Sequence, residues 1–251
     1  MVKSGTGTIQ SWYVRQVRSS FYGSGREIYL SGPFNRCTGM SVPALIPFKP
    51  KNPKTRLSCV LDLPEREKFA QMMLCDVVVA VREAGCEPFI LGTEPFSFNG
   101  IKVVHDPRGL NESINAYLER TPGPLLIIMA DIALASDSAI RRMITTSADM
   151  AIVPGSGGGT NAIFLSRADR FRVSYYGMSF EKHLRIAEEC GLSCEIVDSF
   201  LIHTDVDEKE DLVELLIHGK GMSSEYLREL GFTLSAEKGR VGVVREKARR
   251  D

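Results

Sequence analysis

Strand-like and helix-like segments alternate along the chain from residue 42 to residue 217. The most apolar of them, PLLIIMAD (124–131), has the composition expected of a strand that is covered on both faces. The expected strands are 42–48, 86–91, 101–106, 124–131, 149–154, 162–166 and one within 194–207. This alternation predicts an α/β fold in a single domain, with a mainly parallel, mixed sheet flanked by helices.

The helices are expected from apolar periodicity and from end signals. The first begins at Pro64 and stops before Gly85, with apolar side chains at steps of three and four on one face. Asp207 and Glu210, three apart, predict a capping box for a later helix. The remaining expected helices are 110–120, 136–147, 179–190 and 208–217, followed by a short helix and a basic extended stretch in 222–251.

Residues 1–41 differ from the rest of the chain, because they are rich in Ser, Gly, Arg and Tyr and follow no clean period. We therefore expect an N-terminal arm (1–41) and one folded domain (42–251). Met40 stands directly before the first strand, so one hypothesis is that the native protein begins there. The alternative is a basic, flexible arm.

Charge and hydropathy exclude several classes of protein. The chain carries 31 Lys plus Arg and 31 Asp plus Glu, so it lacks the basic excess of a non-specific nucleic-acid binder. Its apolar runs are shorter than the roughly 20 residues that span a bilayer, and its start lacks the apolar core of a secretory signal. We expect a cytoplasmic protein that binds neither nucleic acid nor membrane.

Four cations follow the first strand, within eight residues: Lys49, Lys51, Lys54 and Arg56. Ligands of open α/β sheets bind beyond the carboxyl ends of the strands, so this loop is a candidate site. Its cations can hold a triphosphate and neutralise the charge that develops in phosphoryl transfer. A solvated surface loop is the alternative.

Three carboxylates are candidates for a metal site. Asp131 ends the most apolar strand, where a carboxylate is costly unless it is paired, caps a helix or binds a metal. Asp205 and Asp207 alternate, so in an extended segment they share a face, and their like charges favour a cation between them. Magnesium prefers such oxygens, combined with substrate phosphates. Capping is the alternative for Asp131 and Asp207, and it leaves Asp205 unexplained.

The glycine-rich segment GSGGGTN (155–161) offers unobstructed backbone N–H groups and the hydroxyl of Thr160. Such loops suit a phosphate or carboxylate, although a hairpin would have the same composition. The segment matches neither a Walker loop nor a Rossmann fingerprint.

Taken in order, several segments resemble the 2-phospho-L-lactate guanylyltransferase family, which serves biosynthesis of the deazaflavin hydride coenzyme of methanogens. They are KPKNPKTRL after the first strand, GLN at 109–111, ADI at 130–132, GGGTN, S-F-x-x-H at 179–183 and D-x-D-x-x-E-D at 205–211. The resemblance covers roughly residues 42–217, and it implies a GT-A-like nucleotidyltransferase domain.

The resemblance also implies roles for individual residues. The residues concerned are Asp131, Asp205 and Asp207 as ligands of Mg²⁺; Lys49, Lys54 and Arg56 at the triphosphate; Gly109 and Asn111 near the nucleoside; and Thr160, Gly177 and Ser179 at the phosphate or carboxylate of the acceptor acid. Of these, Lys54, Arg56 and Asp131 would be catalytic.

The implied reaction transfers GMP from GTP to the phosphate of 2-phospho-L-lactate and releases pyrophosphate. A phosphate nucleophile needs no strong base, so catalysis would rest on positioning and charge neutralisation. A homodimer and a downstream deazaflavin transferase are the partners that the resemblance suggests.

Two departures from the family pattern bear on these roles. Ala133 stands where the wider group often has a proline, which shapes a turn only. Gly177 and Ser179 are one residue closer than is usual, so Tyr176 is an alternative occupant of the glycine position. Other acceptors, namely phosphoenolpyruvate, 3-phosphoglycerate or a molybdopterin, stay open. A nucleotide-binding sensor without activity is a further alternative, and an RNA-binding scaffold ranks last.

Overall fold

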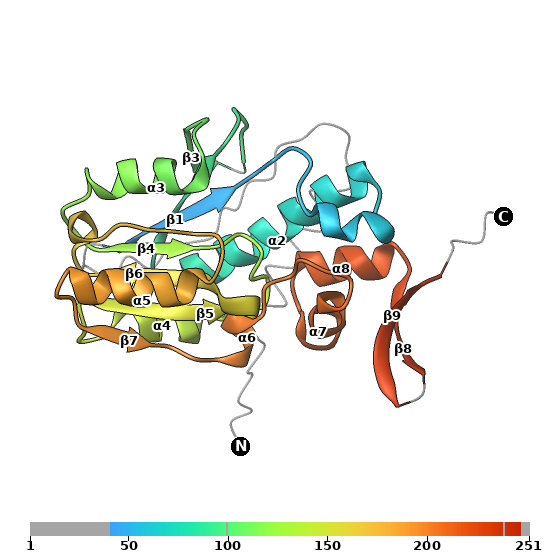
Figure 1. Ribbon diagram of the computed structural model, residues 1–251. Helices are drawn as coiled ribbons and strands as arrows, with labels where there is room; N and C mark the ends of the chain where they lie inside the picture. The colour runs from blue at the N-terminus through green and yellow to red at the C-terminus, as the bar shows by residue number, and fades with distance from the viewer. Residues whose placement is uncertain (1–40, 99, 238, 247–251) are drawn as a thin grey trace, which may run out of the picture.

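The computed structural model describes residues 41–98, 100–237 and 239–246. The expected arm and the proposed start at Met40 lie outside these residues, apart from Ser41. A seven-stranded sheet in the order β3-β2-β1-β4-β6-β5-β7 forms the centre of the fold (Figure 1). Its strands are β1 (Pro43–Phe48), β2 (Glu87–Gly92), β3 (Lys102–His105), β4 (Leu125–Ile128), β5 (Met150–Gly155), β6 (Gly159–Leu165) and β7 (Cys194–Ile196).

The sheet is mainly parallel but mixed. Strands β3, β2, β1 and β4 run parallel to one another, and β7 is parallel to β5. Only β6 opposes both of its neighbours, β4 and β5, among the strands described. The predicted α/β class with a mainly parallel, mixed sheet is therefore confirmed.

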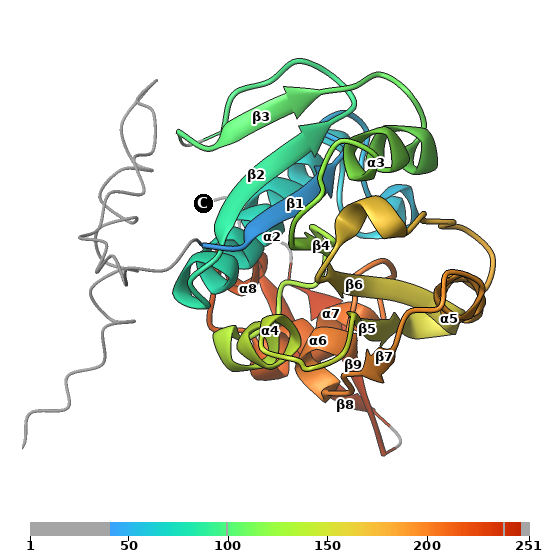
Figure 2. The ribbon, with the colours of Figure 1, turned by 90° about the vertical axis from the view of Figure 1, so that its left-hand side faces the viewer.

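Helices cover both faces of the sheet, as Figure 2 shows. One face packs against α2 (Leu63–Glu83) and α4 (Asp137–Ile144), and the other against α3 (Leu110–Leu118) and α5 (Ser179–Glu189). Successive residues of β1 alternate between the two cores: Ala44 and Ile46 belong to the first, and Leu45 belongs to the second. This double burial explains why β1 and β4 are apolar at every position.

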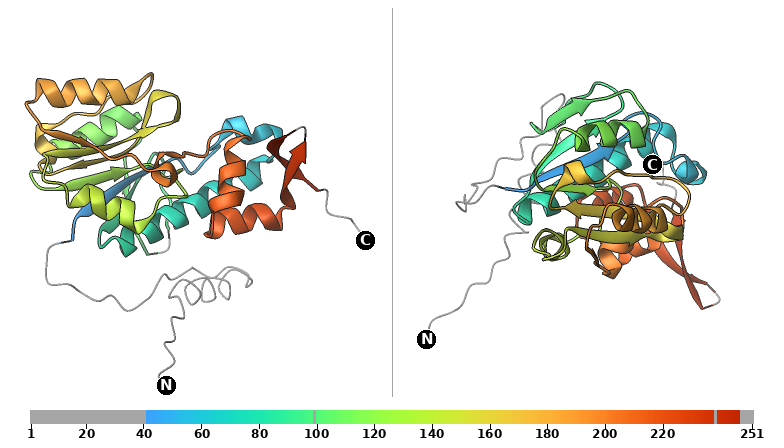
Figure 3. Two further views of the ribbon diagram at one scale, coloured as in Figure 1. Left: turned by 90° about the horizontal axis from the view of Figure 1, so that it is seen from below. Right: turned by 60° about the vertical axis from the view of Figure 1, so that its left-hand side comes forward.

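Helix α2 begins as its sequence predicts. The Asp62 side chain accepts a hydrogen bond from Glu65 N at 2.9 Å, and the Glu65 side chain accepts one from Asp62 N at 3.0 Å. Pro64 follows in the first turn, where its missing N–H costs nothing. The helix crosses behind the sheet and continues past it (Figure 3).

Five elements complete the fold: α6 (Phe200–His203), α7 (Asp211–His218), α8 (Met222–Glu229), and a hairpin of β8 (Phe232–Glu237) and β9 (Arg240–Arg245). Helix α6 packs beside β5, α8 packs along α2, and α7 and the hairpin pack with α8 at one end of the molecule (Figures 1 and 3). The sequence predicted a short helix and an extended stretch here, and the structure folds that stretch into the hairpin. No helix within the described ranges is long and apolar enough to cross a membrane.

Asp76 joins α8 to the interior of α2. Its carboxylate accepts hydrogen bonds from Met222 N at 2.7 Å, from Ser223 N at 3.0 Å and from the Ser223 hydroxyl. These donors lie at the start of α8, so Asp76 caps that helix from another element. Gly221 is required beside it, because a Cβ there would lie 2.3 Å from Asp76 Oδ1. Burial raises the pKa of Asp76 to about 6.

Candidate active site

A cavity of about 550 Å³ opens beyond the carboxyl ends of β1, β2 and β4. These strands are adjacent and parallel, so the loops that follow them meet at one edge of the sheet. The predicted site residues that line the cavity are Lys49, Lys54, Arg56, Gly109, Asp131 and Asp207. The predicted residues outside its lining are Asn111, Thr160, Gly177, Ser179 and Asp205.

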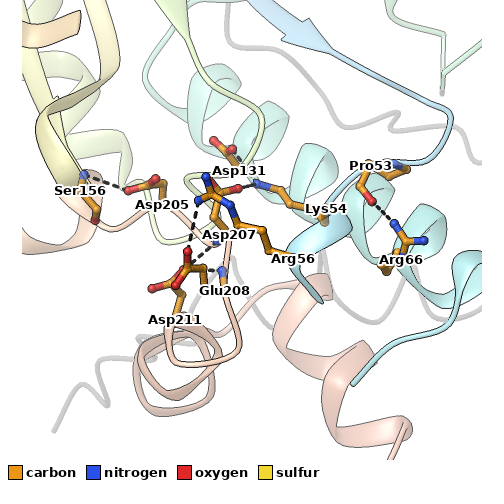
Figure 4. A network of polar contacts seen from close by, with 10 residues as sticks. All are labelled: Pro53, Lys54, Arg56, Arg66, Asp131, Ser156, Asp205, Asp207, Glu208 and Asp211. Atoms are coloured by element: carbon orange, nitrogen blue, oxygen red, sulfur yellow. Dashed lines mark hydrogen bonds and ion pairs between the residues drawn. The ribbon is translucent and has the colours of Figure 1, made fainter. Parts of the chain in front are cut away.

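The Lys54 ammonium bridges two carboxylates in this lining. Its Nζ lies 2.7 Å from Asp131 Oδ2 and 2.5 Å from Asp207 Oδ1, and Figure 4 shows both carboxylates turned toward it. The Lys54 side chain is 10% exposed. Burial alone would lower the pKa of Lys54, but the two carboxylates outweigh it and hold that pKa above its ordinary value. Lys54 is therefore charged across the neutral range.

Backbone contacts bring the two carboxylates together across 76 residues of sequence. Val206 N donates a hydrogen bond to Asp131 O at 3.1 Å, and the Val206 side chain is fully buried. This contact seats the 204–207 segment against the end of the β4 loop. Asp207 then projects from the segment toward the cavity.

The loop that carries Lys54 is held in an uncommon conformation. Asn52 and Lys54 both have positive φ, 47° and 49° respectively, in the left-handed region that side chains other than glycine rarely adopt. The buried Arg66 stabilises this path, because its Nη1 donates to Asn52 Oδ1 at 3.0 Å and to Pro53 O at 2.7 Å. The Lys54 carbonyl accepts from Leu57 N at the start of the following 3₁₀ helix, η1 (Thr55–Cys59). The position of Lys54 is thus fixed by its neighbours.

The predicted capping box of Asp207 is wrong. Helix α7 begins at Asp211, and the Asp211 carboxylate reaches back to the amides of Asp207 and Glu208 at 2.8 and 2.7 Å. The Asp207 side chain is consequently left to pair with Lys54. A capping role for Asp131 is also ruled out, because Ser136 caps the helix that follows it.

Asp205 takes a different direction from Asp207. Its Oδ1 accepts a hydrogen bond from Ser156 N at 3.1 Å, at the turn of the glycine-rich hairpin between β5 and β6 (Figure 4). The predicted strand within 194–207 ends at Ile196, so Asp205 and Asp207 follow α6 rather than a strand. Asp205 therefore ties the hairpin to the 204–207 segment in this form of the protein.

Asn161 of the same hairpin holds the end of α6, which directly precedes the 204–207 segment. Its buried side-chain amide donates to Ile202 O at 3.1 Å and to His203 O at 2.8 Å. Gly155 leaves room for it, since a Cβ at Gly155 would lie 2.2 Å from Asn161 Oδ1. The glycine-rich segment is thus a hairpin whose residues hold the acidic segment in place.

Arg108 is a cavity residue that the sequence reasoning missed. Its guanidinium pairs with Asp106, with Nε 2.9 Å and Nη2 2.5 Å from the carboxylate oxygens. The hydrogen bonds from Arg108 hold the pKa of Asp106 down at about 2. Arg108 directly precedes Gly109, the N-cap of α3, and this adjacency was the available signal. Arg108, the exposed Lys49 and Arg56 are thus three cations of the cavity lining besides Lys54.

Asn111 supports the cavity from outside. Its side-chain amide donates to Tyr175 O at 3.3 Å and accepts from Tyr175 N at 2.7 Å. Asn115, one turn later, pairs in the same way with Val173. The two side-chain amides thus bond to the backbone N–H and C=O groups of Val173 and Tyr175, as a neighbouring strand would. The predicted contact of Asn111 with a nucleoside stays a prediction.

Tyr176 follows this segment and reaches the cavity. Tyr176, Gly177 and Met178 all have positive φ, at 74°, 47° and 48°. Tyr176 lines the cavity with 69% of its surface exposed, whereas Gly177 lies outside the lining. The structure thus puts the tyrosine, the alternative occupant, on the cavity side of this turn.

Thr160 and Ser179 meet in a buried network with His183. Thr160 Oγ1 lies 3.0 Å from His183 Nδ1 and 3.1 Å from Ser179 Oγ. Ser174 N donates to His183 Nε2 at 2.9 Å, which places the proton of the neutral ring on Nδ1. Both hydroxyls are therefore engaged inside the protein, and their contact with an acceptor acid stays a prediction.

The neutral His183 gives a pH dependence of stability. Burial lowers the pKa of His183 from 6.5 to about 4. The stabilisation is present above pH 6.5 and is lost as the pH falls toward 4, because the unfolded chain then binds the extra proton. We expect the unfolding free energy to fall by about 2 kcal/mol between pH 7 and pH 5 from this group. Urea denaturation of the wild type and of His183→Gln measures it, and equal pH slopes would contradict the assignment.

Comparisons with known proteins give matches to one enzyme family. The family model described as guanylyl transferase CofC like matches residues 42–249. A protein of Methanoregula boonei named 2-phospho-L-lactate guanylyltransferase is 56% identical over 202 residues, which cover 80% of this chain and 94% of that protein. One of the same name from Methanosarcina mazei is 46% identical over 207 residues, covering 80% of this chain and 98% of its own length.

A solved structure shares the fold at low sequence identity. It is a protein of Desulfovibrio desulfuricans G20 described as a nucleotide-diphospho-sugar transferase, with a TM-score of 0.65 and 17% identity. The likeness covers 76% of this chain and 95% of that one. The expected GT-A-like architecture is confirmed by this likeness.

Proposed function

The chain belongs to the guanylyl transferase CofC-like family, and we propose that it transfers GMP from GTP to the phosphate of 2-phospho-L-lactate. The observation that carries this proposal is the cavity in which cations and the Asp131–Lys54–Asp207 bridge meet at one edge of the sheet. Relatives named 2-phospho-L-lactate guanylyltransferase, 44–56% identical, support the choice of nucleotide and acceptor.

The residues of the cavity suit nucleotidyl transfer. An oxygen of the acceptor phosphate attacks the α-phosphorus of GTP, and the bond to the β-phosphate breaks to release pyrophosphate. Lys54, Arg56 and Arg108 supply positive charge for the triphosphate and for the leaving pyrophosphate. No residue needs to accept a proton, since the attacking phosphate is already ionised.

Magnesium is part of this proposal. No three His, Cys, Asp or Glu side chains within the described ranges form a group that could hold a metal by themselves. Asp131 and Asp207 nevertheless fit Mg²⁺, which takes one or two carboxylates together with substrate phosphates. The Lys54 ammonium that they share stands in for such a cation. When bound, the metal would neutralise charge on the phosphates. Asp205, whose Oδ1 accepts from the Ser156 amide, is the third proposed ligand.

The remaining parts of the proposal rest on the family. They are the place of the reaction in deazaflavin coenzyme biosynthesis, a homodimeric state, a downstream transferase that takes up the product, and a location in the cytoplasm. Thr160, Gly177 and Ser179 remain proposed contacts of the acceptor. For the two hydroxyls, such contact requires an exchange of partners within the His183 network.

The proposal is tested by pyrophosphate release from purified protein with Mg²⁺. GTP, ATP and CTP are each combined with 2-phospho-L-lactate, phosphoenolpyruvate or 3-phosphoglycerate. We expect release to be fastest with GTP and 2-phospho-L-lactate, by about tenfold or more over the other pairs. Faster release with another acid would keep nucleotidyl transfer and replace the acceptor. Release with none of the pairs would contradict the enzymatic proposal.

A further inference from the structure

We infer that Lys54 acts as an internal counter-cation, which competes with a divalent metal for Asp131 and Asp207 and releases both carboxylates when a triphosphate is bound. This inference rests on the proposed function, because it takes the two aspartates as the metal ligands. It makes the metal and the nucleotide bind as a coupled pair, rather than independently.

The first support is the place of the ammonium. Lys54 Nζ lies within 2.7 Å of an oxygen of each aspartate, and its side chain is almost wholly withdrawn from solvent. A metal that binds both carboxylates would lie close to this ammonium, whichever of their oxygens it used. Two cations so close together would repel each other strongly, so the lysine and the metal exclude one another there.

The second support is that the backbone of Lys54 is fixed, whereas its side chain has rotatable bonds. The backbone of Lys54 is held at φ 49°, and its carbonyl accepts from Leu57 N. The four-carbon side chain has rotatable bonds beyond this anchor, and it ends in a compact charge that binds phosphate well. The ammonium can therefore change partners without movement of the loop.

The third support is the cationic side of the cavity. Arg56 and Arg108 line the same cavity as Lys54, so phosphates bound there would offer Lys54 a replacement partner. Arg56 pairs with Glu208 at 3.2 Å and touches neither of the bridged aspartates. Of the cations in the described cavity lining, Lys54 alone bridges the pair, which gives it alone the competing role.

These contacts predict a specific coupling between ligands. Metal alone must displace Lys54 into solvent, whereas metal with a triphosphate displaces it onto phosphate. The wild type should therefore bind the metal more tightly when the nucleotide is present, by at least about tenfold. Lys54→Met removes the charge but keeps most of the length of the side chain. This variant should therefore bind metal in the absence of nucleotide at least about tenfold more tightly than the wild type does.

The test is titration of Mn²⁺, with the free ion followed by its electron paramagnetic resonance signal. Wild type, Lys54→Met and Lys51→Met are compared without nucleotide and with a non-hydrolysable GTP analogue, whose own binding of Mn²⁺ is measured without protein and subtracted. Lys51→Met is the matched control, because it removes one charge from the same loop and Lys51 pairs with Glu94 outside the bridge. We expect it to bind Mn²⁺ as the wild type does.

Two results would overturn the inference. One is equal Mn²⁺ affinity of wild type and Lys54→Met, and the other is nucleotide-independent affinity in the wild type. Circular dichroism checks folding, and Lys54→Gln replaces the methionine variant if the latter unfolds. The wild-type comparison needs no variant at all. Because Mn²⁺ binding is read without acceptor or turnover, failure here is distinct from failure of the proposed GMP transfer.

Discussion

Asp131→Asn is expected to lower kcat/KM for GMP transfer by about 10³-fold while leaving the protein folded. The amide has the same shape as the carboxylate but lacks its charge, so it binds a hard cation poorly. The contact that seats the 204–207 segment is retained, because it uses the backbone oxygen of Asp131. Lys54 keeps Asp207 as its partner, so the loss of unfolding free energy should stay below the about 3–5 kcal/mol expected for a buried charge left unpaired.

Steady-state kinetics with GTP and 2-phospho-L-lactate measure this effect, and urea denaturation measures stability. Asp137→Asn is the matched control, because Asp137 lies in the first turn of α4 and pairs with Arg141 one turn later. The control should keep wild-type activity. An Asp131→Asn enzyme with activity within about tenfold of the wild type would remove Asp131 from the proposed metal site.

Lys54→Met is expected to lower kcat/KM by about 10²-fold, because the triphosphate and the leaving pyrophosphate lose a cation. The direction is opposite to the effect on metal affinity, which rises in the same variant. A purely structural role for Lys54 would predict that both quantities fall together. Measuring kcat/KM and metal affinity on this one variant therefore distinguishes a direct role of Lys54 in the reaction from a purely structural role.

Lys51→Met serves again as the control for activity. Lys51 lies outside the lining of the cavity, and its side chain is 73% exposed. We expect its kcat/KM to stay within about twofold of the wild type at moderate ionic strength, since exposed charges are screened there. If this control lost as much activity as Lys54→Met, the general charge of the loop would explain both results.

The fold class was predictable because it depends on local patterns. The apolar run at 124–131 and the amphipathic helix after Pro64 are both legible within one segment. The place of β6 was not predictable, because an antiparallel strand between β4 and β5 is fixed by pairing across the sheet. The run after Cys194 was misread for a related reason. Short apolar stretches suit a strand or a helix, and Phe200–His203 became helical.

The site was predictable where strand ends determine it. Lys54 and Asp131 follow adjacent parallel strands, so topology alone brings them to one edge. The cap of α7 was missed because a second acid, Asp211, lies within reach of the same amides and competes with the expected box. Sequence spacing does not decide between two such carboxylates.

Thr160 and Ser179 have protein partners that the sequence did not predict. Thr160 stands in a glycine-rich segment that could cradle an anion, and the family resemblance implied a binding role for Ser179. The His183 ring contacts the Thr160 hydroxyl from 23 positions away, and Ser179 donates to that same hydroxyl. Such a tertiary contact leaves no mark in the local sequence.

Transfer of GMP to the phosphate of 2-phospho-L-lactate is tested most directly by identifying the product of the wild-type enzyme. Protein, GTP, Mg²⁺ and 2-phospho-L-lactate are incubated together and followed by ³¹P nuclear magnetic resonance. We predict two mutually coupled phosphorus signals of an unsymmetrical diphosphate, which appear in equal amount with pyrophosphate. Release of inorganic phosphate without the coupled pair, or an unchanged mixture, would contradict transfer of GMP to the phosphate of the acid.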